Sequence, residues 1–78
     1  MENQMNFQQI VEMVSWKHRL PSDRVLSHIR TAPEVRARHE IMFIAYNNSY
    51  SVPQITKLIK RDYTSVLNGI KRHKERMK

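Results

Sequence analysis

Three helix-start signals divide this 78-residue chain, and they constrain its fold more than any other feature. In each signal, a short polar residue that can cap a helix is followed three positions later by Glu or Gln, which completes a capping box. The pairs are Asn6 with Gln9, Thr31 with Glu34, and Ser51 with Gln54. The sequence has one Gly and no period-two alternation of apolar residues, so nothing in it indicates strands. It therefore predicts an all-α fold.

Apolar residues at helical spacing fill the segments between these signals. The expected helices cover residues 6–18, 22–27, 32–47, 52–59 and 62–75. The longest, 32–47, has the broadest apolar stripe and is expected to be central, with Arg36, Arg38 and Glu40 off that stripe. A short helix, a tight turn at Lys60-Arg61 and a longer helix with a polar leading face make a helix-turn-helix. The predicted fold class is an all-α, small five-helix bundle that contains this motif.

Residue type suggests structural roles for five further residues. Ser22 is expected to cap the second helix. Trp16 is expected in the core, and Leu58 and Leu67 are expected to face inward from the last two helices. Gly69 lies inside the last helix, where Gly costs about 1 kcal/mol relative to Ala. We expect another backbone to approach closely at that position.

Length and charge indicate one small domain, residues 1–78, with a core at about 6–73 and a basic tail at 74–78. The net charge is +7, from 14 Lys and Arg against 7 Asp and Glu. The excess lies almost entirely in residues 49–78, around the last helix. Basic charge gathered around one helix is typical of a nucleic-acid binder. The alternative interpretation is a solvated face or a basic tail.

The sequence lacks the residues that several classes of protein require. There is no Cys, no Gly-rich phosphate loop, and no spacing among the four His that suits a metal. Residues 1–5 carry no apolar run of the signal-peptide type, and no apolar stretch is long enough to span a membrane. We therefore expect a cytoplasmic, nucleoid-associated protein that is not an enzyme. It should have no cofactor, metal, membrane association or small-molecule substrate.

The segment from residue 60 to residue 67 carries the strongest functional signal. Two cations are followed by an acid, an aromatic residue and two small hydroxyl residues, where the last helix begins. Such a helix tip can enter a DNA groove, with the cations on phosphates and the small side chains at base edges.

This segment also resembles a known family. Residues 61–67, Arg-Asp-Tyr-Thr-Ser-Val-Leu, resemble the Arg-Asp-His-(Ser/Thr)-Thr-Val-Leu element of the C-terminal DNA-binding domain of the bacterial replication initiator DnaA. Residues 25–27 with Arg30 and 35–39 resemble its Leu-Leu-Ser, basic loop and Ala-Arg-Gln elements, and residues 51–55 resemble its Ser-Leu-Pro-Glu-Ile-Gly. The likeness covers about residues 7–73. The initiator's ATP-binding module is absent from this sequence.

The resemblance implies that the last helix reads the major groove and that Arg30 enters the minor groove. The expected base contacts are Asp62, Tyr63, Thr64, Ser65, Asn68 and Arg30. The expected phosphate contacts are Arg61, Lys60, Lys57, Arg38 and Lys71. The sequence departs from the family at Tyr63, where the family has His, and at Ile29 and Ala32, where its basic loop has cations. Alternatively, Asp62 and Ser65 only cap the helix, Tyr63 packs against Tyr50 or the fourth helix, and Arg30 pairs with Glu34.

The expected partner is double-stranded DNA, bound by a bacterial or phage-encoded protein that regulates replication or transcription by occupancy. A protein partner is also possible, such as the initiator, a polymerase or a phage assembly. Two alternatives remain open at this point: a helical protein-interaction module with a basic face, and a phage DNA-packaging recognition subunit. RNA binding is less favoured, because A-form RNA closes its major groove to side chains.

Overall fold

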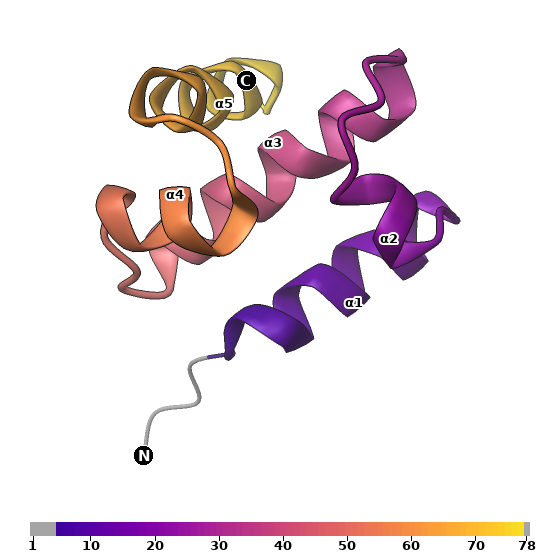
Figure 1. Cartoon of the computed structure of the whole chain (residues 1–78), viewed down its shortest axis with the longest axis horizontal. Helices are drawn as coiled ribbons and strands as arrows, with labels where there is room; N and C mark the ends of the chain where they lie inside the picture. Colours follow the sequence, from indigo (N-terminus) through magenta and orange to yellow (C-terminus); the bar gives the residue numbers. More distant parts are fainter. Residues whose placement is uncertain (1–4, 78) are drawn as a thin grey trace.

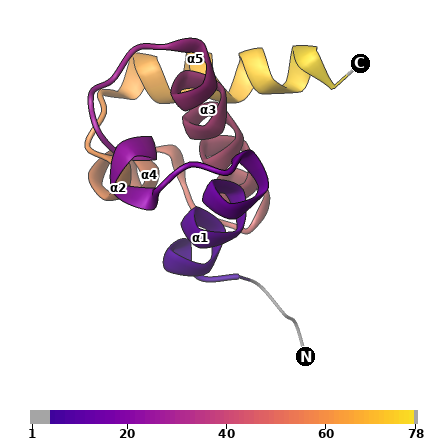
Figure 2. The ribbon, with the colours of Figure 1, turned by 90° about the vertical axis from the view of Figure 1, so that its right-hand side faces the viewer.

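The computed structural model describes residues 5–77, and five α-helices lie in that range. They are α1 Phe7–His18, α2 Ser22–Val25, α3 Ala32–Asn47, α4 Val52–Ile59 and α5 Tyr63–Arg76. Helix α3 passes between α1 and α5 in both ribbon views (Figure 1, Figure 2). The all-α prediction is confirmed. Two predictions concern residues outside the described range. They are the absence of a signal-peptide run, which rests mostly on residues 1–4, and the basic tail at its last residue, Lys78.

Two of the three predicted capping boxes form. The Asn6 side chain accepts a hydrogen bond from the Gln9 backbone N–H at 2.8 Å, and the Gln9 side chain accepts one from the Asn6 N–H at 3.0 Å. Ser51 and Gln54 make the same reciprocal pair at 3.2 and 2.8 Å. Thr31 takes the N-cap position of α3, but its side chain makes no capping bond to the backbone. Capping side chains therefore mark the starts of α1 and α4, whereas α3 begins at the predicted residue without that bond.

The short helix α2 differs from its prediction. Pro21, with φ of −63°, occupies the N-cap position, and Ser22 is the first helical residue instead of the cap. The helix also ends at Val25 and not at Ser27. The Ser27 hydroxyl donates to the Arg24 carbonyl at 2.6 Å, a local bond that competes with helix continuation.

The core lies where α3 meets the other helices. Its buried apolar side chains are Ile10, Val11, Val14, Val25, Ala37, Ile41, Met42, Ala45, Ile55, Ile59 and Val66. The prediction of burial is wrong for three residues. Trp16 is 85% exposed, Leu58 is 42% exposed and Leu67 is 43% exposed. Trp16 lies about half a turn away from the buried Val14 around α1, so it points away from the core.

Helix α3 buries charged side chains because other helices pack around it. Glu34, Arg38 and Glu40 are each at most 6% exposed, so the prediction that Arg38 and Glu40 lie off the buried face is wrong. Arg36 is exposed as expected. Each buried charge has a partner, as burial requires. Glu34 accepts hydrogen bonds from the Thr31 hydroxyl and from Arg24 Nε, and these bonds lower its pKa from 4.5 to about 2.

Glu40 is held in the same way from α1. Lys17 Nζ donates to Glu40 Oε2 at 2.7 Å, and His18 Nε2 lies 2.8 Å from Glu40 Oε1. Burial alone would raise the Glu40 pKa, but the hydrogen bonds from His18 and Lys17 outweigh it, and the pKa is lowered. This cluster joins the C-terminal end of α1 to the middle of α3.

Gly69 lies where α5 crosses α3. A Cβ atom at Gly69 would fall 2.2 Å from Met42 Sδ and 3.1 Å from the His39 ring. The close approach is therefore made by side chains of α3, and the prediction of an approaching backbone is wrong. Within residues 5–77, none of the helices has the length and apolar character needed to cross a membrane.

Candidate nucleic-acid interface

A tight turn sets the direction of α5 relative to α4. Lys60 ends α4 in the left-handed conformation, with φ of 59°, and its backbone N–H bonds to the Thr56 carbonyl. The Arg61 N–H bonds to the same carbonyl at 3.3 Å. The chain then extends at Asp62 and enters α5 at Tyr63. This geometry is the short helix, turn and longer helix expected of a helix-turn-helix.

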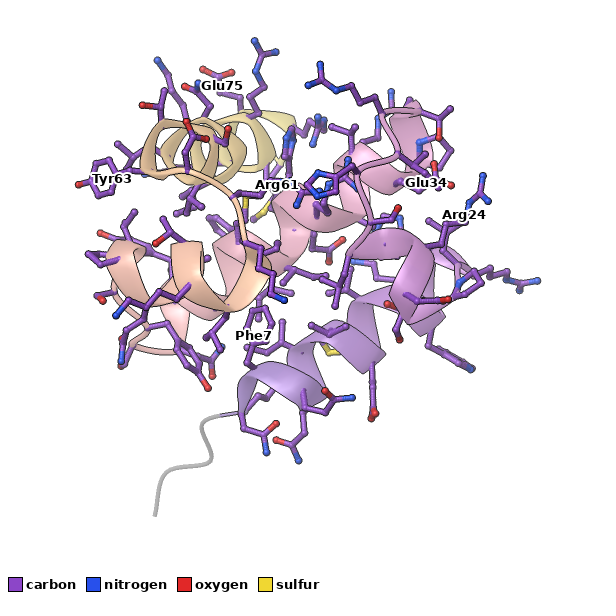
Figure 3. The ribbon with its side chains drawn as sticks, viewed as in Figure 1. Phe7, Arg24, Glu34, Arg61, Tyr63 and Glu75 are labelled. Atoms are coloured by element: carbon purple, nitrogen blue, oxygen red, sulfur yellow. The ribbon has the colours of Figure 1, made fainter. Side chains whose placement is uncertain are left out.

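The tip of α5 is exposed. Asp62 caps the helix by accepting a hydrogen bond from the Ser65 backbone N–H at 3.3 Å. Hydrogen bonding to Ser65 also lowers the Asp62 pKa, so Asp62 is a carboxylate at neutral pH. Tyr63 is 54% exposed and lies at the outer edge of the molecule (Figure 3). Thr64 is exposed as well. Asp62 therefore caps the helix and still remains exposed.

A second element, the α2–α3 loop at residues 26–31, is held by two arginines, one from α3 and one from the turn before α5. Arg38 donates through Nη1 to the Val25 carbonyl at 3.0 Å and the Ser27 carbonyl at 2.9 Å, and through Nη2 to the Ile29 carbonyl. Arg61 Nη2 donates to the Ser27 carbonyl at 2.5 Å. The guanidinium of Arg61 thus joins the turn before α5 to the loop that carries Arg30.

These contacts correct the role predicted for Arg38. Its side chain is 5% exposed and is engaged by loop carbonyls, so it does not lie on the surface as a free phosphate ligand. Arg61 is half-buried and is also partly engaged. Arg38 is better described as a residue that positions the loop.

Arg30 is exposed and forms no ion pair among residues 5–77. The alternative pairing with Glu34 does not occur, since the carboxylate of Glu34 is taken by Arg24 and Thr31. The side chain of Arg30 is therefore available to a partner.

A hollow of about 480 Å³ lies between the α2–α3 loop and α5, and we call it the arginine hollow. Its lining residues are His28, Arg30, Val35, Arg38, His39, Met42, Arg61 and Ser65. None of these residues is acidic, and three are arginines. The arginine charges add to burial in lowering two pKa values here. Burial, then the charges of Arg61 and Arg30, lower the Arg38 pKa. Burial and nearby arginines lower the His39 pKa to about 4. The hollow suits an anion.

The other predicted contact residues are exposed, and Ser65 also lines the arginine hollow. Ser65, Asn68, Lys57, Lys60 and Lys71 are exposed. Tyr63 makes no ring contact with Tyr50 in the described structure, where Tyr50 instead packs edge-on against Phe7, with ring centroids 6.3 Å apart.

Two histidines that line the arginine hollow, His28 and His39, were not among the contact residues predicted from the sequence. His28 directly precedes the predicted loop residues Ile29 and Arg30, so its position along the chain was a usable signal. No comparable signal existed for His39, because its place depends on how α3 packs against α5.

Comparison with protein families gives a match over most of the chain. Residues 7–72 match the family model described as the bacterial dnaA protein helix-turn-helix. Searches of curated proteins and of solved structures gave no match. The matched range spans α1 to α4 and most of α5.

Proposed function

The chain belongs to the bacterial DnaA helix-turn-helix family, a family of DNA-binding domains, and we propose that it binds double-stranded DNA at specific sequences. In this proposal the tip of α5, residues 62–65, enters the major groove. The α2–α3 loop places Arg30 in the neighbouring minor groove. The protein acts by occupying its sites, as a regulator of replication or transcription or as a DNA-recognition subunit.

The observation that carries the proposal is the position of the α5 tip beside the arginine hollow. Asp62 and Thr64 are both exposed and can read base edges. The Asp62 carboxylate can accept from the amino group of cytosine, and the Thr64 methyl can contact the thymine methyl. The arginine hollow can seat the backbone phosphate that lies between the two grooves. Lys57, Lys60 and Lys71 are exposed for further phosphates.

A sequence-selection experiment tests this proposal. The protein is incubated with a random pool of duplex DNA, and the bound molecules are sequenced. We expect one motif to be enriched, and we expect Thr64→Ala to lose the preference at one base pair while it keeps the rest of the motif. The matched control is Lys74→Ala, on the same helix but far from its tip, which should select the wild-type motif. Recovery of no motif by the wild-type protein would refute sequence-specific reading.

A further inference from the structure

The most unusual surface of the molecule lies away from α5, at the C-terminal end of α1. Trp16 is 85% exposed there, and Met13, one turn earlier, is 40% exposed. Trp is among the more buried residue types on average, and large apolar side chains that cluster on a surface often mark an interaction site. Neither residue has a part in the proposed DNA contacts.

Trp16 borders a hollow of about 710 Å³, which we call the tryptophan hollow. Its lining residues are Ser15, Trp16, Lys17, Arg19, Leu20 and Pro21. Backbone bonds hold this turn in shape: the Arg19 N–H bonds to the Trp16 carbonyl at 3.1 Å and the Leu20 N–H to the Ser15 carbonyl at 2.9 Å. Arg19 closes α1 in the left-handed conformation, with φ of 58°. The backbone around the hollow is therefore preformed, so little backbone freedom is lost when the hollow is filled.

The charge around the tryptophan hollow is of one sign. Lys17 and Arg19 are both exposed, and none of the lining residues is acidic. Lys17 already contacts Glu40, yet its side chain remains 63% exposed. Arg19 has no ion pair among residues 5–77. The acid nearest along α1, Glu12, is one turn before Trp16 and accepts a hydrogen bond from Gln8.

We propose that the tryptophan hollow binds an acidic peptide segment of a partner protein, with an apolar side chain of the peptide packed on Trp16 and its carboxylates beside Lys17 and Arg19. Apolar burial would supply most of the affinity, and the charges would orient the segment. Charge disfavours a second copy of this chain, because a two-fold contact would bring Lys17 and Arg19 toward their own equivalents. The proposal is independent of the DNA-binding proposal.

The position of the tryptophan hollow allows both partners to bind at once. Helix α3 lies between α1 and α5 in both ribbon views (Figure 1, Figure 2). A peptide on the C-terminal end of α1 therefore does not cover the α5 tip. Binding of this kind would bring a second protein to the DNA site that the domain occupies.

The test uses the only tryptophan of the chain as its reporter. The probe is the capped peptide Glu-Asp-Leu-Asp-Glu-Leu-Leu-Glu-Asp, which contains no aromatic residue. We expect it to shift Trp16 emission to shorter wavelength, with saturation and a dissociation constant below about 1 mM. The same peptide with its three Leu replaced by Ser should bind at least about fivefold more weakly. No change in emission at millimolar peptide would overturn the proposal.

Variants locate the binding by calorimetry. Trp16→Ser and Arg19→Asn should each weaken peptide binding by about fivefold or more. Asn tolerates the left-handed conformation of Arg19, so the end of α1 is preserved. The matched control Lys74→Asn removes one charge from α5 and should change peptide affinity less than about twofold. Unchanged affinity in Trp16→Ser would overturn the proposal.

Two further measurements separate this proposal from its alternatives. Peptide affinity should be the same when mixed-sequence duplex covers the basic face at low salt, and displacement of the peptide by duplex would place it on the DNA surface instead. Sedimentation should show a monomer. A concentration-dependent dimer that Trp16→Ser abolishes would make a second copy the occupant and overturn the proposed partner. Duplex binding by Trp16→Ser should match wild type, so either proposal can fail alone.

Discussion

Replacing Arg38 with Lys tests whether this residue positions the α2–α3 loop or contacts DNA. The substitution keeps the positive charge but removes the forked guanidinium, which donates to the carbonyls of Val25, Ser27 and Ile29. A lysine ammonium has all its donors on one nitrogen, so it cannot occupy the two separate positions from which Nη1 and Nη2 meet these carbonyls. A phosphate ligand would tolerate the change, whereas a loop anchor would not.

The magnitude follows from the carbonyls that lose their donors. A hydrogen bond to a charged group contributes about 1.5–3 kcal/mol. The Ser27 carbonyl keeps the donor from Arg61, and Ile29 is half-buried, where water can replace the guanidinium. The bond to the Val25 carbonyl is buried, and its loss is not compensated in this way. We therefore expect Arg38→Lys to lower the free energy of unfolding by about 1.5–3 kcal/mol. A domain of this length has only about 4–12 kcal/mol in total.

Urea unfolding followed by far-UV circular dichroism measures this loss. The matched control is Arg36→Lys, an exposed arginine on the same helix, which should change stability by less than about 0.5 kcal/mol. If Arg38→Lys is as stable as Arg36→Lys, the carbonyl contacts do not hold the loop and the reasoning is refuted.

Three further predictions concern packing, pH and salt. Gly69→Ala should stabilise the fold by less than the about 1 kcal/mol that helix propensity alone would supply, because the new Cβ displaces Met42 Sδ. A urea midpoint raised by the full propensity gain would contradict this contact. Acid titration should show Glu34 stabilising the fold above its usual pKa of 4.5, with that contribution lost as pH falls toward its folded value of about 2. Glu34→Gln should flatten stability over that interval, and an unchanged pH profile would contradict the assignment. In duplex binding, four phosphate contacts, at Lys57, Lys60, Arg61 and Lys71, predict a slope of log K against log salt of about −3.6. Lys71→Ala should reduce the magnitude of this slope by about 0.9, and Lys74→Ala should leave it unchanged.

Local signals in the sequence were enough to predict most of the helix boundaries. The capping boxes at Asn6 and Ser51 place the starts of α1 and α4, and α3 covers the predicted residues 32–47. Such caps depend on residues only three positions apart, so the sequence contains the whole interaction. The exposure of residues 62–65 was also predictable, because a run of polar residues at a helix start favours contact with solvent.

Features that depend on packing between helices were not predictable in this way. Arg38 is a surface residue by its chemistry, and only the folded chain brings it to the carbonyls of residues 25–29. The contact of Gly69 with Met42 depends equally on how α5 crosses α3. Trp16 is a different case. Its spacing from the apolar stripe already placed it on the outer face of α1, and the usual preference of Trp for the interior was given too much weight.

The most direct test of the central proposal separates reading from capping at residue 62. Asp62→Asn keeps a side chain that caps helices as well as Asp does, so the domain should stay folded, with only a small fall in thermal midpoint from the lost carboxylate charge at the helix start. The amide has a different pattern of donors and acceptors at the base edge. We therefore predict that the ratio of affinities for the selected duplex and for a scrambled duplex falls roughly 5- to 150-fold, the equivalent of about 1–3 kcal/mol. An unchanged ratio would mean that the start of α5 does not read DNA bases at residue 62.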